Sequence, residues 1–263
     1  MNQIRPKKSL GQHFLTSEKV LHRILDAAEP LEGALAVEVG PGTGVLTQGL
    51  LERGARVVAV EKDEALAAKL ADEAGERLTV IGGDILITNL HEVIGSRPYR
   101  VVANIPYYLS GRLFRYFFEQ APRPESLILL IPNEVAERLT AGPGELNLLG
   151  LSAQLHGEPE ILFTVPPTSF RPAPKVDSAV VRVRIFPEPA PLSREILTLA
   201  RHAFAGRRKQ LRSSLSAGLQ LPASDIEGLL ASAGIQPSRR PQELSIAEWA
   251  SLAKAAVERG VLS

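Results

Sequence analysis

Short apolar runs alternate with amphipathic stretches from residue 34 to about residue 131. The apolar runs are LAVEVG, ARVVAVE, LTVIGGD, YRVVAN and SLILLI, and the stretches between them include GVLTQGLLERG and DEALAAKLADEAG. Near-continuous β-branched and aliphatic runs that alternate with helical patterns are typical of a parallel sheet covered by helices on both faces. The pattern therefore predicts a doubly wound, Rossmann-like α/β fold.

The pattern changes in the second half of the chain. PEILFTV and KVDSAVVRVRIF follow with little helix between them, and alternation late in the second run predicts an antiparallel strand near the sheet edge. The Pro-rich stretch FPEPAPLSR (186–194) indicates a linker, and the helical pattern after it has Ser193 as its predicted N-cap. We therefore expect a domain at 1–186, opened by a basic segment and helix at 1–30, and a small all-α domain at 193–263.

The composition limits the class of protein. A chain of 263 residues with 44% hydrophobic residues can bury one large core and a smaller one. No apolar run reaches the ~18 residues of a membrane span, and the basic N-terminus lacks the apolar stretch of a signal peptide. The lack of Cys excludes disulfides and cysteine-ligated zinc, and the His residues show no metal-ligand spacing. We expect a soluble, cytoplasmic protein.

The positive charges are clustered along the chain, although the net charge is only +1. The first 25 residues carry five cations against one acidic residue, and RRKQLR gathers four cations in six residues. Local basic clusters on a near-neutral chain favour either an anionic partner or solvated helix faces, and both interpretations stay open. The cations are Arg5, Lys7, Lys8, Lys19 and Arg23 in the first cluster, and Arg207, Arg208, Lys209 and Arg212 in the second.

A glycine-rich turn follows the first predicted strand and opens a helix in VEVGPGTGVLT. Gly40, Gly42 and Gly44 let the backbone pass close to a ligand, and the helix N-terminus beyond them offers free amides. The dinucleotide pattern G-x-G-x-x-G would need a third glycine at the position of Val45. The turn therefore favours a nucleotide-like ligand more than a dinucleotide pyrophosphate.

The next two predicted strands end in acidic residues. Glu61 ends VAVE and follows Gly40 by 21 residues. A carboxylate at this spacing from the glycine turn can accept hydrogen bonds from both ribose hydroxyls. Asp84 ends GGD and can accept a hydrogen bond from an adenine amine. For either residue alone, a strand-end cap or a surface charge is the favoured interpretation, but the carboxyl ends of parallel strands meet at one edge of the sheet. Together they predict a nucleoside site.

A polar and aromatic cluster, NIPY (104–107), ends the fourth strand at the same edge. Asn104 has an acceptor oxygen, Pro106 holds a tight turn, and Tyr107 offers a flat face on which a base can stack. Such a set suits a planar substrate that bears an amine. The Asn104 oxygen and the carbonyl of Ile105 or Pro106 would accept the two amine hydrogens, while the nitrogen faces an electrophile held by the glycine turn.

These motifs resemble those of a known family. GPGTGVLT, VEKD, GGDI and NIPY are similar to the motifs of adenine-N6 methyltransferases that use S-adenosylmethionine. KKSLGQHFL, EVAERLTAGPGE, PTSFRPAPKVDSAVVRV and HAFAGRRKQLRSSL extend the resemblance to the small-subunit (16S) ribosomal RNA adenine N6,N6-dimethyltransferase family. The resemblance implies an enzyme of ribosome biogenesis that dimethylates two adjacent adenines near the 3′ end of that RNA. It implies small-subunit RNA or the pre-30S particle as partner, with no membrane and no metal, and we expect a monomer.

The resemblance also implies roles for individual residues. Those that border S-adenosylmethionine are Gln12, His13, Leu15, Gly40, Gly42, Glu61, Asp84, Ile85 and Asn104. Those that form the catalytic clamp on the target adenine are Asn104, Pro106 and Tyr107. Phe170 is expected to be a second stacking face for the base, and the residues expected to bind RNA phosphates are Arg207, Arg208 and Lys209.

The sequence departs from the family in several places. His13 stands where many members have Asn, Pro132 stands where many have Gln, and LNLLGLSAQ replaces a stretch resembling YGRLSV. The last two departures lie outside the cofactor motifs and bear on the surface that contacts RNA. NIPY is shared with the related large-subunit methylases, whereas NLPY is commoner in the small-subunit group.

Three alternative functions stay open. The first is a large-subunit (23S) rRNA adenine N6-methyltransferase, which the near-neutral charge and the Ala-rich C-terminal helices disfavour. The second is a non-catalytic RNA-binding assembly or transcription factor on the same fold, which the intact glycine turn and NIPY disfavour. The third is a dinucleotide oxidoreductase, which Val45 disfavours.

Overall fold

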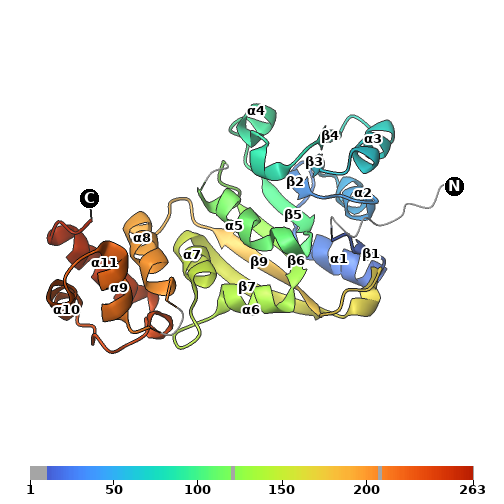
Figure 1. Ribbon diagram of the computed structural model, residues 1–263. Coiled ribbons are helices and arrows are strands. Elements are labelled where there is room, and N and C mark those ends of the chain that lie inside the picture. Colours follow the sequence, from blue (N-terminus) through green and yellow to red (C-terminus); the bar gives the residue numbers. More distant parts are fainter. Residues whose placement is uncertain (1–10, 120–121, 207–208, 263) are drawn as a thin grey trace. The chain divides into compact units, whose positions relative to one another are not determined.

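The structure is a computed structural model that describes residues 11–119, 122–206 and 209–262. The chain forms two compact units (Figure 1). The first comprises Met1–Ala136 and Glu158–Pro187, and the second comprises Glu137–Gly157 and Glu188–Ser263. Residues 137–157, which the sequence analysis placed in the first domain, therefore group with the C-terminal helices. The division into domains at 1–186 and 193–263 otherwise stays a prediction.

The described part of the first unit contains a seven-stranded sheet in the order β4-β3-β2-β5-β6-β9-β7. Neighbours from β4 to β6 run parallel, and β9 pairs antiparallel with β6. The predicted α/β fold and antiparallel strand are thus confirmed. The strands are β2 (Leu35–Val39), β3 (Arg56–Glu61), β4 (Leu78–Gly82), β5 (Arg100–Asn104), β6 (Ser126–Pro132), β7 (Gly157–Val165) and β9 (Ser178–Ile185).

Continuous apolar sequence makes the central strands. Every residue of β2 is buried, and the middle of β5 is buried on both faces. Helices whose apolar residues face the sheet supply the cover. Two of them, α1 and α3, begin with a side-chain cap: Ser17 Oγ accepts from the amide of Val20, and Asp63 Oδ1 accepts from that of Ala65. The helices of this unit are α1 (Glu18–Ala27), α2 (Val45–Glu52), α3 (Glu64–Asp72), α4 (Leu90–Ile94) and α5 (Ser110–Glu119).

A second, two-stranded sheet ties the N-terminal segment to a distant loop. β1 (Phe14–Leu15) pairs antiparallel with β8 (Phe170–Arg171), so Leu15 lies opposite Phe170. The Thr16 amide donates to the Ser169 carbonyl at 2.8 Å and extends this contact. Short 3₁₀ turns at Ile85–Ile87, Tyr107–Leu109 and Pro167–Ser169 follow β4, β5 and β7.

The second unit is helical around a core that contains Trp249, which is fully buried and lies 5.9 Å from the Phe204 ring. Its helix α8 starts at Ser193 behind an N-cap at Leu192, so the prediction of Ser193 as the N-cap is wrong by one residue. α6 (Asn133–Thr140) begins in the first unit and ends in the second. The other helices are α7 (Leu148–His156), α8 (Ser193–Phe204), α9 (Leu211–Leu219), α10 (Ala223–Ser232), α11 (Ile246–Glu258) and the 3₁₀ turn Pro241–Glu243. No helix in the described part of the chain is long and apolar enough to cross a membrane.

We predict that Gly150→Ala lowers the free energy of unfolding by about 1–3 kcal/mol. Asn147 caps α7 and donates through Nδ2 to the Arg138 carbonyl at 2.8 Å, so α6 and α7 approach closely. A Cβ at Gly150 would lie 2.5 Å from that carbonyl oxygen, and backbone would have to shift. Urea denaturation measures the loss. Gly111→Ala in α5 is the control, since a Cβ there meets no atom within 4 Å; equal losses in both variants would contradict the prediction.

Candidate active site

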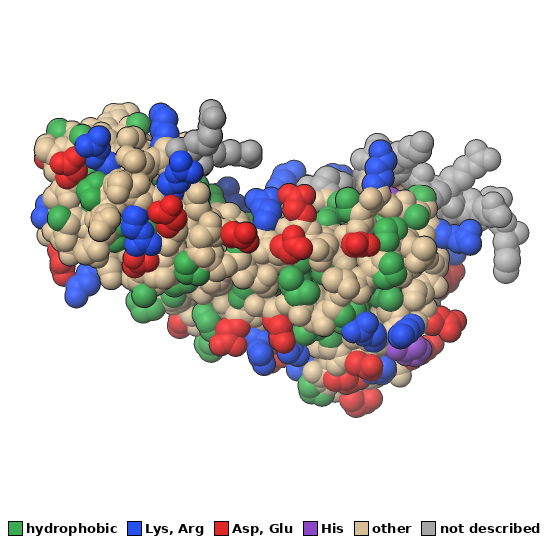
Figure 2. Space-filling view, turned by 90° about the horizontal axis from the view of Figure 1, so that it is seen from below, with side chains coloured by type: hydrophobic (Ala, Val, Ile, Leu, Met, Phe, Trp, Pro, Cys, Tyr) green, Lys and Arg blue, Asp and Glu red, His purple; other side chains and the backbone are tan. Residues whose placement is uncertain are grey.

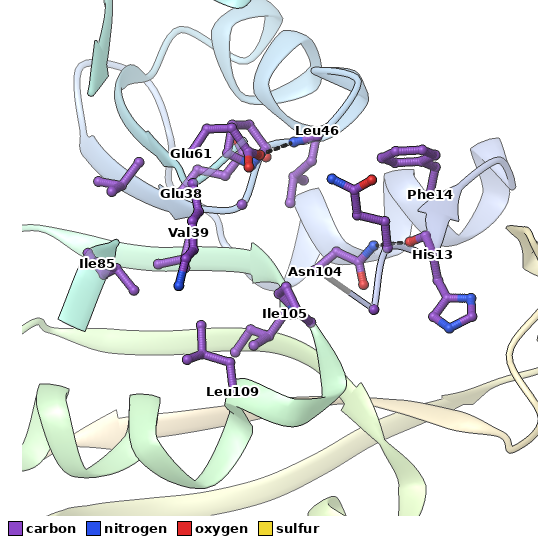
Figure 3. A pocket seen from close by; sticks show the side chains of 18 of the residues that line it. His13, Phe14, Glu38, Val39, Leu46, Glu61, Ile85, Asn104, Ile105 and Leu109 are labelled. Atoms are coloured by element: carbon purple, nitrogen blue, oxygen red, sulfur yellow. Dashed lines mark hydrogen bonds between the residues drawn. The ribbon is translucent and has the colours of Figure 1, made fainter. Parts of the chain in front are cut away.

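A pocket opens at the carboxyl edge of the parallel strands (Figure 3). It holds about 970 Å³ of empty space, part of it open to solvent. Residues that follow β2, β3, β4 and β5 line it, together with the N-terminal segment 11–15. The structure thus brings most of the predicted site residues into one pocket. They are Gln12, His13, Leu15, Gly40, Gly42, Glu61, Asp84, Ile85, Asn104, Pro106 and Tyr107.

The turn between β2 and α2 needs glycine at two positions. Gly42 has φ +59°, and a Cβ on it would lie 3.0 Å from the Phe14 ring. Gly44 has φ +82° and is the N-cap of α2, where it provides no side-chain hydrogen bond. The first amides of α2 therefore have no side-chain cap from this residue and lie beside the pocket, where Val45 and Leu46 line its wall.

Glu61 joins the end of β3 to the glycine turn. Its Oε2 accepts a hydrogen bond from the Gly42 amide at 3.0 Å, and its Oε1 accepts one from the Asp63 amide at 2.8 Å. The residue is 5% exposed. Each carboxylate oxygen has a second lone pair, so Glu61 retains acceptor capacity toward hydroxyl groups of a ligand.

Asp84 is a charged acceptor at the end of β4. Its Oδ1 accepts from the Leu86 amide at 3.0 Å, and its Oδ2 forms an ion pair with Lys62 Nζ at 2.9 Å. Burial alone would raise the pKa of this carboxyl, but the hydrogen bonds from Lys62 and Leu86 outweigh it and hold the pKa below its ordinary value. Lys62 lines the pocket and was not among the predicted site residues.

Asn104 is oriented by the N-terminal segment. Its Nδ2 donates to the His13 carbonyl at 3.0 Å, as the dashed line in Figure 3 marks. The opposite side-chain atom, Oδ1, accepts no hydrogen bond from the described residues. The bond to His13 uses one of the two Nδ2 hydrogens and orients the amide, which retains Oδ1 as an open acceptor for further partners.

The two carbonyls that follow Asn104 differ in their partners. The Pro106 carbonyl accepts from the Leu109 amide at 2.9 Å. The Ile105 carbonyl accepts no hydrogen bond within the described parts of the chain. Of the two acceptors that the sequence analysis left open, Ile105 is thus the one with both lone pairs available.

Two contacts hold Tyr107 in place, one at its hydroxyl and one on the face of its ring. Its hydroxyl shares a 2.6 Å hydrogen bond with Ser178 Oγ on β9, and burial raises the pKa of this phenol. The imidazole of His13 is stacked on the ring, with centroids 5.3 Å apart and planes inclined by 28°. Ser178 is fully buried and was missed by the sequence analysis, because only the pairing of β6 with β9 brings it near Tyr107.

The structure corrects the expectation for Phe170. This residue is 2% exposed, belongs to the hydrophobic core and does not line the pocket. Its pairing with Leu15 across β1 and β8 buries the ring, so it offers no open stacking face. Arg207 and Arg208 lie outside the described residues, and Lys209 is exposed in the second unit.

Glu38 is a carboxyl group buried inside the central strand β2. It is 1% exposed, and Thr47 Oγ1 on α2 donates to its Oε2 at 2.6 Å. Burial raises its pKa to about 8, the neighbouring charge of Glu61 adds to this effect, and the bond from Thr47 opposes it. At neutral pH Glu38 is therefore protonated, and it fastens α2 to the strand before the glycine turn.

We predict that the Glu38→Gln variant loses a pH dependence of stability. The folded protein retains a proton on Glu38 between the ordinary pKa of 4.5 and about 8, whereas the unfolded chain has lost it. Stability should therefore fall as pH rises through this window, by up to about 1.4 kcal/mol per pH unit. Urea unfolding at several pH values checks this. Glu38→Gln should flatten the decline of the unfolding free energy with pH, and the exposed control Glu52→Gln should not. Identical slopes in the wild-type protein and both variants would refute a raised pKa for Glu38.

No group of three or more His, Cys, Asp or Glu residues that could hold a metal ion is found among the described residues. The groups that line the pocket include carboxylates, carbonyls, amides and aromatic rings.

Comparison with known proteins agrees with this geometry. The family described as ribosomal RNA adenine dimethylase matches residues 3–258. A ribosomal RNA small subunit methyltransferase A of Dehalococcoides mccartyi is 40% identical over 256 residues, which cover 95% of this chain and 88% of the relative. The enzyme of the same name from Sphingopyxis alaskensis is 41% identical over 260 residues, covering 94% and 93%.

Solved structures share the fold. The 23S rRNA methyltransferase ErmE is 26% identical with a TM-score of 0.71, over 92% of this chain and 98% of that one. A dimethyladenosine transferase from Plasmodium falciparum is 24% identical with a TM-score of 0.78, over 94% and 98%. Because the family match spans nearly the whole chain, this protein belongs to the ribosomal RNA adenine dimethylase family, whose methyl donor is S-adenosylmethionine.

Proposed function

We propose that this protein transfers methyl groups from S-adenosylmethionine to the N6 amines of two adjacent adenines near the 3′ end of small-subunit rRNA. The product is N6-dimethyladenosine, and the substrate is the pre-30S particle, on which the protein acts as a monomer in the cytoplasm. The observation that carries the proposal is the pair of open acceptors, Asn104 Oδ1 and the Ile105 carbonyl, beside a pocket with nucleoside-binding chemistry. Relatives named small subunit methyltransferase A support the choice of RNA.

The residues of the pocket fit S-adenosylmethionine. Glu61 retains lone pairs for ribose hydroxyls, and Asp84 carries a negative charge suited to an adenine amine. Gly40 and the turn after it bring backbone to the pocket wall without a side chain in the way. The bound cofactor supplies an electrophilic methyl group on a sulfonium.

The clamp residues orient the target amine. An adenine must leave its helix stack to reach this edge, and the Tyr107 ring offers the face on which it stacks. Asn104 Oδ1 and the Ile105 carbonyl then accept the two hydrogens of the amine. Two carbonyl acceptors favour a pyramidal nitrogen, which frees its lone pair from the ring.

None of the pocket acids is suited to act as a base. Glu38 already carries a proton at neutral pH, both oxygens of Glu61 accept backbone amides, and Asp84 is paired with Lys62. The methylated amine is acidic enough to lose its proton to water. The protein therefore contributes mainly position and electrostatics.

RNA phosphates would contact exposed cations, among them Lys209 of the second unit. On the face drawn in Figure 2, Lys and Arg side chains are interspersed with Asp and Glu. Because the two signs alternate among the described residues on that face, the contacts we expect are local and dispersed.

Methyl transfer to purified ribosomal particles tests this function. Small subunits from a strain that lacks the modification should accept label from S-adenosylmethionine, and mass spectrometry should locate it on two adjacent adenines. Asn104→Ala should lower the rate by about 10²–10³-fold, the cost of removing one polar contact to a reacting centre. Its affinity for the particle should persist, since Asn104 contacts no phosphate in the proposal. Label on large-subunit RNA instead, or full activity in the variant, would reject the proposal.

Substitutions of Tyr107 separate its ring from its hydroxyl. Tyr107→Phe loses only the hydrogen bond to Ser178, so we expect a loss of less than about tenfold in kcat/KM. Tyr107→Ala loses the stacking face, which contributes about 1–3 kcal/mol per base, and kcat/KM should fall by about tenfold or more beyond the Phe variant. Steady-state kinetics on small subunits measures both. Equal losses would show that the ring does not stack on the base.

A further inference from the structure

The imidazole of His13 lies on the ring that the proposed function assigns to the target base. The two ring centroids are 5.3 Å apart, with planes 28° from parallel, which is the geometry of an offset aromatic stack. Tyr107 cannot easily turn away, because Ser178 holds its hydroxyl at 2.6 Å. One face of the Tyr107 ring is thus covered by a side chain of the same protein.

The orientation of His13 separates its ring from the cofactor half of the pocket. In Figure 3 the ring points away from Glu61 and lies beyond Asn104. Its Nδ1 lies 2.7 Å from the Pro172 carbonyl. The resemblance placed His13 beside the cofactor, but the ring is directed toward the clamp on the target adenine.

The main chain and the side chain of His13 are held independently. The backbone is fixed by the bond from Asn104 Nδ2 to the His13 carbonyl and by the pairing of Phe14 with Arg171. The imidazole is held by the stack on Tyr107 and the one bond to Pro172, at a partly exposed site. Rotation about its side-chain bonds can therefore remove the ring from Tyr107 without disturbing the backbone that orients Asn104.

We propose that the His13 imidazole covers the base-stacking face of Tyr107 in the free enzyme and is exchanged for the target adenine. The inference rests on the proposed function. A planar imidazole resembles the five-membered half of a purine, so it can occupy the same face. An adenine that enters must replace this stack, so every RNA has the same free-energy cost to overcome through its other contacts.

A fixed wall is the competing role for His13. If the base inserts next to an imidazole that stays in place, removal of the ring weakens binding. If the base replaces the imidazole, removal of the ring strengthens it. The sign of the change in KM therefore decides between the two roles.

Kinetics with a short, unstructured oligoribonucleotide that contains adjacent adenines provides the first test. His13→Ala and His13→Asn should each lower KM for this probe by about two- to tenfold, which corresponds to the free energy of one aromatic pair. Asn is the sharper variant because it retains a polar side chain and removes only the ring. His91→Asn on the exposed surface of α4 makes the same chemical change elsewhere and should leave KM unaltered. A raised KM in both His13 variants overturns the inference.

Proton NMR of the wild-type protein provides a test that needs no active variant. The Cε1 proton of His13, assigned by its loss in His13→Asn, should be shifted upfield by the Tyr107 ring in the free enzyme. Tyr107→Leu should abolish that shift. Addition of the oligonucleotide with S-adenosylhomocysteine at constant pH should also abolish it, and a shift that persists at saturation overturns the exchange.

The two proposals fail differently. A wild-type protein that transfers no methyl group to small subunits overturns the proposed function and the exchange together. An active wild-type protein with a raised KM in the His13 variants, or with a persistent His13 shift, overturns the exchange alone.

Discussion

The hydrogen bond from the Gly42 amide to the buried Glu61 carboxylate fixes the shape of the pocket. It closes the turn after β2 onto the end of β3, and the closed turn leaves room for Phe14 only because residue 42 has no Cβ. Phe14 lies next to His13, whose carbonyl in turn orients Asn104. The nucleoside half of the pocket and the clamp on the amine are therefore connected through the N-terminal segment.

The arrangement of acids gives the pocket a defined charge. Glu38 and Glu61 are close enough for their charges to interact, and two buried carboxylates would repel each other. The protein avoids this by keeping Glu38 protonated, with Thr47 as its partner. Asp84 is stabilised as an anion by Lys62. Among the described residues Glu61 has backbone amides rather than a cation as its partners, so its carboxylate suits hydroxyl donors or a cationic ligand.

The sheet and the strand-end residues could be predicted because they depend on local sequence. Continuous β-branched runs indicate buried parallel strands, and the fold then places Glu61, Asp84 and Asn104 at one edge. Phe170 could not be predicted, because its burial depends on pairing with Leu15, which is remote in sequence. Ser178 needed the register of β9 against β6 for the same reason. For Glu38 a signal existed, since a carboxylate inside the apolar run LAVEV must be neutral or paired.

Many of these contacts orient other protein groups because the reaction depends on positioning the target amine rather than on acid–base chemistry. The amine of adenine is a weak nucleophile, and the pocket acids all have partners that occupy or neutralise them. Rate enhancement must then come from holding a nitrogen in line with a methyl carbon, where small displacements are costly. An asparagine whose amide could rotate would offer its donor as often as its acceptor. The bond from Asn104 Nδ2 to the His13 carbonyl removes that freedom before any substrate arrives, which is why the backbone of the N-terminal segment is as much a part of the site as the strand ends.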